Sequence, residues 1–310
     1  MRSLPLLLAV LFLLSGCTSI QGSLYDFGIA SERSRAGLQA LRVTIQGQQL
    51  HFLERAGDRP HQATLVLIHG FAGNKDHWVR LVPHLPSHYR VLVPDLPGHG
   101  DNAPDTMQTY DIAHLTAAVW GLVEARTEGS VVLVGNSLGG RVTAELALDH
   151  PDRVRALVLL DPAGVPAPEP SALDQALLRG ENWLIPTTPA EYDSLTAIAF
   201  GDDPPDLPWP AEAVVARRYA ARAFLYRAVW RDLGPDFSTL PPRLPSLSVP
   251  TLLLWGSEDG ILHPSAAARW AELVPEITVE LLEGVGHAPM LEQPEATAHR
   301  IAEFLRSLGN

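Results

Sequence analysis

The chain has 310 residues, of which 46% are hydrophobic and 19% are charged, and this composition provides ample apolar material for a packed core. Its formal net charge is -12. That charge argues against a nucleic-acid partner, which needs a basic surface, and against purely electrostatic docking on an anionic membrane. The single cysteine excludes an internal disulfide and a zinc site built from several thiolates.

The N-terminal residues are typical of a bacterial export signal. A basic start precedes an apolar run at 4–14, which is too short to span a bilayer, and Ser15-Gly16-Cys17 follows. This ending resembles the bacterial lipobox, in which the cysteine is lipidated and becomes the mature N-terminus. We therefore expect a signal peptide at 1–16 and a lipid anchor at Cys17, and the alternatives are an ordinary signal with a chance cysteine or an uncleaved anchor.

A lipid anchor would place the protein on a membrane of the bacterial cell envelope, facing the periplasm or the cell surface. Two or more acyl chains hold a protein stably on a bilayer. Thr18 follows the cysteine, where inner-membrane retention usually involves Asp, so the outer membrane is preferred.

Eight short segments have the patterns of β-strands. The first two and the last alternate apolar and polar residues, as half-exposed strands do, and the five between them are continuous apolar runs, as in strands buried on both faces. In chain order they are 41–45, 49–53, 64–68, 91–93, 131–134, 157–160, 252–255 and 278–282. Helical periodicity at 112–123, 140–149, 266–273 and 295–308 alternates with them. This order predicts an α/β fold with a mostly parallel sheet covered by helices on both faces.

Two segments fall outside this alternation. Residues 17–40 are polar and mixed, and we interpret them as a tether with at most one short helix. The segment between Asp161 and Pro250 is rich in proline, has its best helical pattern at 211–230, and is far longer than a crossover needs. We therefore assign the core to 41–162 and 248–310, and an inserted helical cap to 163–247.

The central motif is Gly135-Asn136-Ser137-Leu138-Gly139, which has the pattern Gly-x-Ser-x-Gly. It directly follows one predicted buried strand and directly precedes a predicted helix. In this setting the serine occupies a tight, strained turn that projects its hydroxyl from the edge of the sheet, where it can act as a nucleophile. A structural turn with a solvent-facing serine is the alternative.

Two backbone N–H groups are expected to form an oxyanion hole. His69-Gly70-Phe71 follows another buried strand, and the N–H groups of Phe71 and Leu138 would donate to a negatively charged substrate oxygen. Each such donor is worth about 3 kcal/mol in the transition state. We interpret His69 as a residue that orients this loop.

The predicted base is His287, in a glycine-flanked loop immediately after the last strand. Triads of this type run in the order nucleophile, acid, base, so the acid is expected at the end of the preceding strand, where Asp259 lies. Its carboxylate would hold one imidazole tautomer and stabilise the protonated ring. Glu258 and Asp161 are the alternative acids, and His99 is the alternative base.

No metal or cofactor is expected. His-Glu-x-x-His and a glycine-rich phosphate loop are both absent from the sequence, and a serine nucleophile with a histidine base needs neither metal nor nucleotide.

Five aromatic residues of the predicted cap are candidates for lining an acyl-chain pocket or for the core of the cap itself. They are Trp183, Trp209, Phe224, Tyr226 and Trp230.

From about residue 41 onward, these motifs together resemble the α/β-hydrolase superfamily. Residues 69–78, 95–100, 135–137 and 161–165 resemble the branch that contains family V bacterial lipases, membrane-attached bacterial phospholipase A enzymes and monoacylglycerol lipases. Members often carry Met where Leu138 stands, a difference that leaves the backbone donor intact. Lys75 and Asp76 in the first of these stretches are expected to form a structural ion pair.

The resemblance implies an α/β-hydrolase fold and a serine hydrolase that cleaves carboxylic esters of lipids, such as monoacylglycerols or (lyso)phospholipids, through an acyl-enzyme. The expected partners are this lipid or another ester and, through the anchor, a membrane. A carbon–carbon bond hydrolase or a thioesterase can share the same three residues. A noncatalytic envelope lipoprotein is the alternative from another class, and the intact serine, acid, histidine and oxyanion loop argue against it.

Overall fold

The computed structural model describes residues 18–58, 63–102, 104–105, 108–201, 204–234, 238–274 and 276–309. The predicted signal peptide at 1–16 and the predicted lipidation site Cys17 lie outside these residues, so both stay predictions. Within the described ranges, no helix combines the length and the apolar character that crossing a membrane requires.

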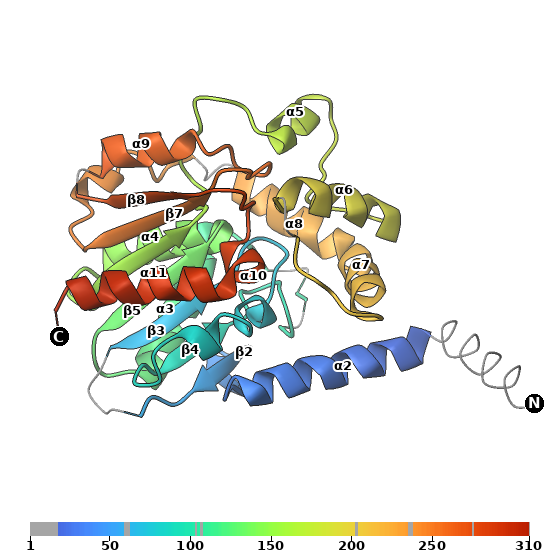
Figure 1. Ribbon diagram of the computed structural model, residues 1–310, viewed down its shortest axis with the longest axis horizontal. Coiled ribbons are helices and arrows are strands. Elements are labelled where there is room, and N and C mark those ends of the chain that lie inside the picture. Colours follow the sequence, from blue (N-terminus) through green and yellow to red (C-terminus); the bar gives the residue numbers. More distant parts are fainter. Residues whose placement is uncertain are drawn as a thin grey trace, which may run out of the picture.

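One eight-stranded sheet forms the centre of the molecule, with strand order β1-β2-β4-β3-β5-β6-β7-β8 (Figure 1). The strands are β1 (Gln39–Ile45), β2 (Gln48–Arg55), β3 (Thr64–Ile68), β4 (Val91–Pro94), β5 (Val131–Asn136), β6 (Val154–Leu160), β7 (Thr251–Gly256) and β8 (Thr278–Leu282). β2 runs antiparallel to β1 and β4, and the other neighbouring strands are parallel. The predicted mostly parallel, eight-stranded sheet is confirmed.

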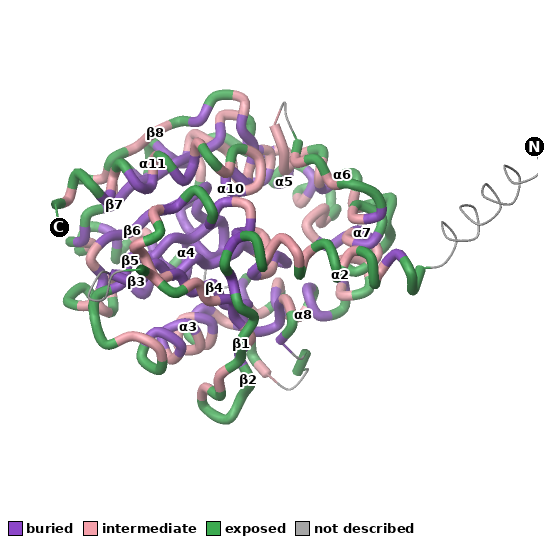
Figure 2. Tube along the Cα trace, turned by 60° about the horizontal axis from the view of Figure 1, so that its bottom comes forward, coloured by how far each residue is buried: buried purple, intermediate pink, exposed green. Residues whose placement is uncertain are grey.

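Helices cover both faces of this sheet. One apolar cluster joins the sheet to α3 (Ile112–Arg126), α4 (Leu138–Asp149) and α9 (Ala266–Leu273). A second cluster joins the opposite face to α11 (Pro294–Ser307) and to the 3-10 turns η1 (Lys75–Trp78) and η2 (Val82–His84). Every residue of β3, β4, β5 and β7 is buried between these layers, as Figure 2 shows for the centre of the molecule. Burial on both faces explains why these strands are continuous apolar runs.

The chain leaves the sheet after β6 and returns to it at β7. In between lie α5 (Ala172–Leu178), α6 (Pro189–Ala199), α7 (Ala211–Ala221), α8 (Ala223–Leu233) and the 3-10 turn η4 (Leu244–Ser246). Helices α5 to α8 gather at one side of the sheet (Figure 1). Side-chain caps define two of their starts, since Ser171 and Asp174 form a capping box on α5 and Thr188 accepts a hydrogen bond from the backbone of Glu191 on α6.

The segment expected to be a tether forms an 18-residue helix, α2 (Thr18–Arg35), which packs against α7 (Figure 1). Arg218 of α7 donates two hydrogen bonds to Asp26, at 2.8 and 2.9 Å. Near the other end of α2, Arg33 donates two hydrogen bonds of 2.6 Å to Asp76. These partners lie far away in the sequence, so a local pattern does not reveal why this helix is ordered.

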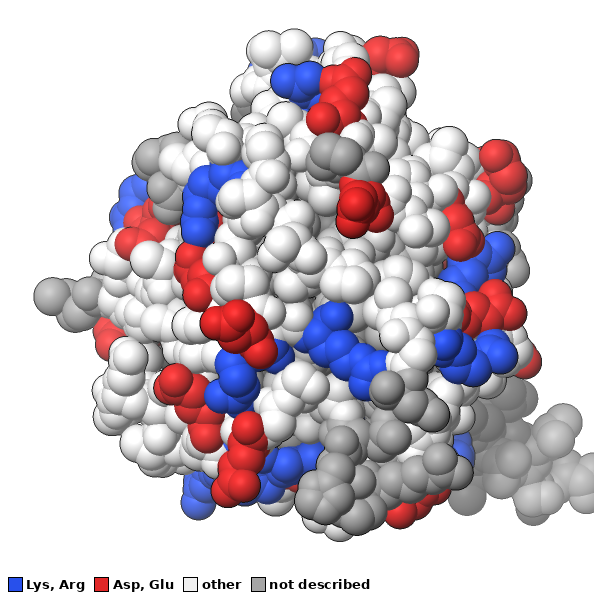
Figure 3. All heavy atoms as spheres, turned by 90° about the vertical axis from the view of Figure 1, so that its left-hand side faces the viewer, with Lys and Arg blue, Asp and Glu red and all other residues white. Residues whose placement is uncertain are grey.

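Charged side chains are mixed on the face of the molecule shown in Figure 3. Lys and Arg lie next to Asp and Glu there, and the part of this face that the structure describes carries no broad basic patch. Such a surface offers little to a nucleic acid, whose phosphates require clustered positive charge.

The close approach of β5 and α4 leads to a prediction about stability. A Cβ atom on Gly135 would lie 2.2 Å from the Gly139 carbonyl oxygen, so Gly135→Ala has to displace backbone. We expect the free energy of unfolding, measured by urea denaturation, to fall by roughly 2 kcal/mol. Gly129→Ala is the control, because a Cβ there meets nothing within 4 Å. Equal stability of the two variants would contradict the described packing.

Candidate active site

Ser137 occupies the turn between β5 and α4. Its φ of 56° and ψ of -119° lie in a region that residues with a side chain rarely adopt. The turn can be this tight because glycines flank it: a Cβ atom on Gly139 would lie 2.2 Å from the carbonyl oxygen of Ile68. Ser137 is 9% exposed and lines a cavity of about 780 Å³, so its hydroxyl sits at the floor of an accessible space.

The structure brings His287 and Asp259 together. His287 lies between β8 and the short helix α10 (Pro289–Glu292), and its Nδ1 is 2.7 Å from Asp259 Oδ2. The other carboxylate oxygen of Asp259 accepts hydrogen bonds from the backbone N–H groups of Ile261 (2.8 Å) and Leu262 (2.9 Å). Because Nδ1–H donates to the carboxylate, Nε2 is the imidazole nitrogen left to accept a proton. His287 lines the same cavity as Ser137.

Three further groups position the His287 loop, and sequence reasoning did not identify them. Asn136 donates from Nδ2 to the His287 carbonyl oxygen at 2.9 Å. The His287 N–H donates to the carbonyl oxygen of Ala199 in α6 at 2.6 Å. Glu292 accepts hydrogen bonds from the N–H groups on either side of His287, at 2.8 and 3.0 Å. Only Asn136, next to the serine, had a position in the sequence that could have suggested this role.

The two predicted oxyanion donors belong to segments next to Ser137, since Leu138 follows it in the chain and a Cβ atom on Gly70 would lie 3.0 Å from the Ser137 Cβ. Phe71 lies in the loop after β3 and lines the cavity, and its N–H makes no hydrogen bond within the described part of the chain. Leu138 is the first residue of α4, so its N–H has no acceptor in a preceding helical turn. The positive end of the helix dipole adds to the field at this point.

Buried histidines support the loop that carries Phe71. His69 Nδ1 donates to the Gly70 carbonyl oxygen (2.8 Å), and its Nε2 accepts from the Leu96 N–H (3.0 Å). Burial, followed by the neighbouring His99, lowers the pKa of His69 well below its ordinary value. Burial also lowers the pKa of His99, the alternative base, to about 4, and His99 is not among the described residues that line the cavity.

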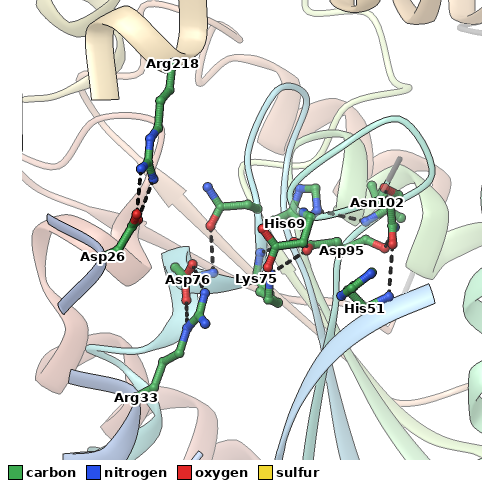
Figure 4. Close-up of polar contacts among 12 residues, drawn as sticks. Asp26, Arg33, His51, His69, Lys75, Asp76, Asp95, Asn102 and Arg218 are labelled. Atoms are coloured by element: carbon green, nitrogen blue, oxygen red, sulfur yellow. Dashed lines mark hydrogen bonds and ion pairs between the residues drawn. The ribbon is translucent and has the colours of Figure 1, made fainter. Parts of the chain in front are cut away.

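A network of ion pairs also stabilises the loop that carries Phe71 (Figure 4). Lys75 Nζ lies 2.6 Å from Asp95 and 2.6 Å from Asp101, and both Lys75 and Asp95 are buried. The expected pair between Lys75 and Asp76 is wrong, because Asp76 points to Arg33 of α2 instead. Adjacent residues at the start of a 3-10 turn point in different directions, so each finds its partner on a different element.

The cavity above Ser137 is built from elements on every side. The loop after β3, the turn at Ser137 and the His287 loop form its base, and α2, α6, α7 and α8 contribute its walls. Of the five cap aromatics considered above, Tyr226 lines the cavity, whereas Trp209 and Phe224 are more than half exposed. The apolar walls are suited to an acyl chain, with lining residues Ile29, Leu184, Leu195, Phe200, Tyr219 and Met290.

The alternative acids differ in their surroundings. Glu258 is exposed, whereas Asp161 is fully buried. Asp161, Asp259 and His287 form the one group among the described residues in which three metal-ligand atoms lie within 4.8 Å of one another. Within it, His287 Nδ1 and one Asp259 oxygen bind each other and the other Asp259 oxygen accepts two N–H groups, so the group fits hydrogen bonding better than metal ligation.

Comparison with known proteins agrees with this geometry. A model described as the alpha/beta hydrolase family matches residues 65–300, more than half of the chain. The chain therefore belongs to the alpha/beta hydrolase family and is an enzyme of the hydrolase class.

Several relatives extend over nearly the whole chain. Lipase 1 of Psychrobacter immobilis is 30% identical over 309 residues, which cover 96% of this chain and 95% of that protein. Human monoacylglycerol lipase ABHD6 is 28% identical over 289 residues, which cover 90% and 85%. The crystal structure of a bacterial membrane phospholipase A, described as a virulence factor, has a TM-score of 0.89 and 34% identity over 99% of this chain and 98% of that one. The predicted resemblance to this branch is confirmed.

The buried histidines predict how stability depends on pH. In the unfolded chain His99 has a pKa of about 6.5, and in the fold burial lowers its pKa to about 4. The unfolded state therefore binds the extra proton between these values, so stability should fall as pH drops through this window, by up to about 1.4 kcal/mol per pH unit. Urea unfolding from pH 7 to pH 4.5 should give a shallower pH dependence for His99→Gln. The control is His84→Gln, at an exposed position, where the free energy of unfolding should depend on pH as in the wild type. A wild-type pH dependence in His99→Gln would contradict the lowered pKa of His99.

Proposed function

We propose that this enzyme cleaves carboxylic esters of lipids, with Ser137 as nucleophile, His287 as general base and acid, and Asp259 as the carboxylate that supports His287. The observation that supports this proposal most is the 2.7 Å contact between Asp259 and His287 at the cavity that also contains the strained Ser137 turn. The lipases and the phospholipase A among the relatives support the same class of substrate.

The reaction proceeds through an acyl-enzyme. His287 Nε2 removes the proton from Ser137, whose oxygen attacks the ester carbonyl carbon, and the N–H groups of Phe71 and Leu138 stabilise the oxyanion. Protonated His287 then donates its proton to the leaving alcohol oxygen as the ester C–O bond breaks. His287 next removes a proton from water, whose oxygen attacks the acyl carbon. As the bond from that carbon to the Ser137 oxygen breaks, His287 returns the proton to Ser137 and the fatty acid is released. Asp259 keeps the imidazole in the required tautomer throughout.

The charges of the cavity favour a lipid that carries phosphate. Arg33, Lys75 and Arg218 each line the cavity and each pairs with a carboxylate. Arg222 also lines the cavity, and no carboxylate of the described residues lies within ion-pair distance of it. It lies near Tyr226, whose pKa burial raises and Arg222 lowers. An unneutralised guanidinium is a good partner for the phosphate of a lysophospholipid or phospholipid.

The predicted lipid anchor would bring this cavity close to a membrane. The described part of the chain begins with α2, at Thr18, next to Cys17 in the sequence, and Tyr25, Ile29 and Arg33 of α2 line the cavity. Lipidation at Cys17 would therefore attach the bilayer to the same element that forms one wall of the site. We propose a location on a bacterial envelope membrane, with lipid drawn from that membrane as the substrate.

The nucleophile is tested by fatty-acid release from short-chain esters, monoacylglycerol, lysophospholipid, phospholipid, triacylglycerol and an acyl thioester. We expect Ser137→Ala to lose activity by on the order of 10⁴-fold or more and to lose labelling by a fluorophosphonate probe. The control is Ser194→Ala, on the exposed face of α6, which should keep both. Silence of the folded wild type on every ester would refute ester hydrolysis, and release from the thioester alone would favour a thioesterase.

The role of Arg222 predicts a change in preference between lipids. With the same acyl chain on both substrates, Arg222→Gln should lower kcat/KM for lysophosphatidylglycerol about tenfold and leave monoacylglycerol within about twofold, because only the former loses a charge-assisted hydrogen bond. The control is the exposed Arg227→Gln on α8, whose N-cap residue is Arg222, and it should change neither. An equal loss on both lipids would show that Arg222 acts on the cavity as a whole.

A further inference from the structure

The proposed mechanism leaves one buried ionisable group at the site without a role. Asp161 follows β6 directly and is 0% exposed. Its φ of 46° is unusual for a residue with a side chain, so the fold holds it in place at a cost in backbone strain. Its N–H donates to the Leu254 carbonyl oxygen at 3.0 Å, and its Oδ1 accepts the N–H of Gly256 at 2.7 Å. Backbone and side chain are thus fixed against β7.

This carboxyl group faces the carboxyl group of Asp259. One oxygen from each residue and one ring nitrogen of His287 lie within 4.8 Å of one another. Two ionised carboxylates at this separation in a buried position repel each other strongly, and neither forms an ion pair with a lysine or arginine among the described residues. One of the two carboxyl groups therefore holds a proton.

The hydrogen bonds decide which one. Asp259 accepts from His287 Nδ1 and from two backbone N–H groups, so its negative charge has three donors. Asp161 accepts one N–H on Oδ1, and no donor among the described residues reaches its buried Oδ2. Burial, then the charge of Asp259, raises the pKa of Asp161 well above its ordinary value; Glu292 adds to this rise, and the Gly256 N–H opposes it. The charge therefore belongs on Asp259 and the proton on Asp161.

We propose that Asp161 is a positioning residue that remains protonated and donates a hydrogen bond from Oδ2 to the carboxylate of Asp259. This inference rests on the proposed function, since it assigns Asp259 as the partner of His287. The extra donor fixes the plane of the Asp259 carboxylate. It also withdraws negative charge from that carboxylate, so Asp259 holds the His287 imidazolium less tightly and the proton is released more readily to the leaving alcohol.

Replacement of Asp161 separates this role from a structural one. Asp161→Asn keeps an acceptor for Gly256 and an N–H donor for Asp259, whereas Asp161→Ala removes both. We expect Asp161→Ala to lower kcat about tenfold and to move the acidic limb of the kcat/KM profile up by about 1 pH unit, since Asp259 then stabilises protonated His287 more strongly. Asp161→Asn should keep the limb in place. The exposed Asp152→Asn is the control and should match the wild type.

Other results would overturn the proposal. A limb that moves down in Asp161→Asn would mean that Asp161 is ionised in the wild type, because neutralising it would then weaken protonation of His287. An unshifted limb in Asp161→Ala, with rates normalised to the sites titrated by a fluorophosphonate, would mean that Asp161 serves only the packing of β6 and β7.

A measurement without substrate keeps the test independent of the ester hydrolase assignment and of the folding of Asp161→Ala. The infrared spectrum of the wild type at pH 7 should contain the C=O stretch of a protonated carboxylic acid. This band should be absent from Asp161→Asn and present in Asp152→Asn. Absence of the band from the wild type would refute a protonated Asp161, whereas its presence in a protein inactive on every ester would leave the proton in place and refute the proposed function.

Discussion

The candidate active site depends on the parallel pairing of β5, β6 and β7. Parallel strands end at the same edge of a sheet, so Ser137, Asp161 and Asp259, which follow these strands, lie together although they are far apart in the sequence. The register pairs Asn136 with Leu160 and Leu160 with Leu254. A slip of one residue between these strands would shift Ser137, Asp161 and Asp259 relative to one another and turn the side chains of the shifted strand to the opposite face.

Among the described residues, no lysine or arginine forms an ion pair with the negative charge of Asp259. Asp259 is 3% exposed, and backbone N–H groups and the His287 imidazole are its donors. Such dipoles are in place before the reaction starts, so in the proposed mechanism they need not reorganise when positive charge forms on His287. Asn136 and Glu292 likewise hold the His287 loop in place, through hydrogen bonds to its backbone. These fixed hydrogen bonds thus take the place of the water molecules that would solvate Asp259 and the His287 loop if they were exposed.

Helices that lie between β6 and β7 in the chain also help to position the site. The end of α6 accepts the His287 N–H at Ala199 and the Gly260 N–H at Ile198 (3.0 Å), so it contacts the loops that carry the proposed base and the proposed acid. Helix α2 pairs with α7 through Asp26 and Arg218, and with η1 through Arg33 and Asp76 (Figure 4). A movement of α2 or α6 would therefore change the positions of residues around the proposed binding site of the ester carbonyl.

The sequence by itself determined the strands and the serine turn, because apolar runs such as 64–68 and the glycines around Ser137 act on their immediate neighbours. It favoured Asp259 as the acid and left Glu258 and Asp161 as alternatives, since all three follow a predicted buried strand. Only the tertiary structure placed Asp259 against His287, left Glu258 exposed and buried Asp161 behind the pair. Helix α2 and the partners of Lys75 were decided in the same way, because contacts between distant segments depend on how the whole chain packs.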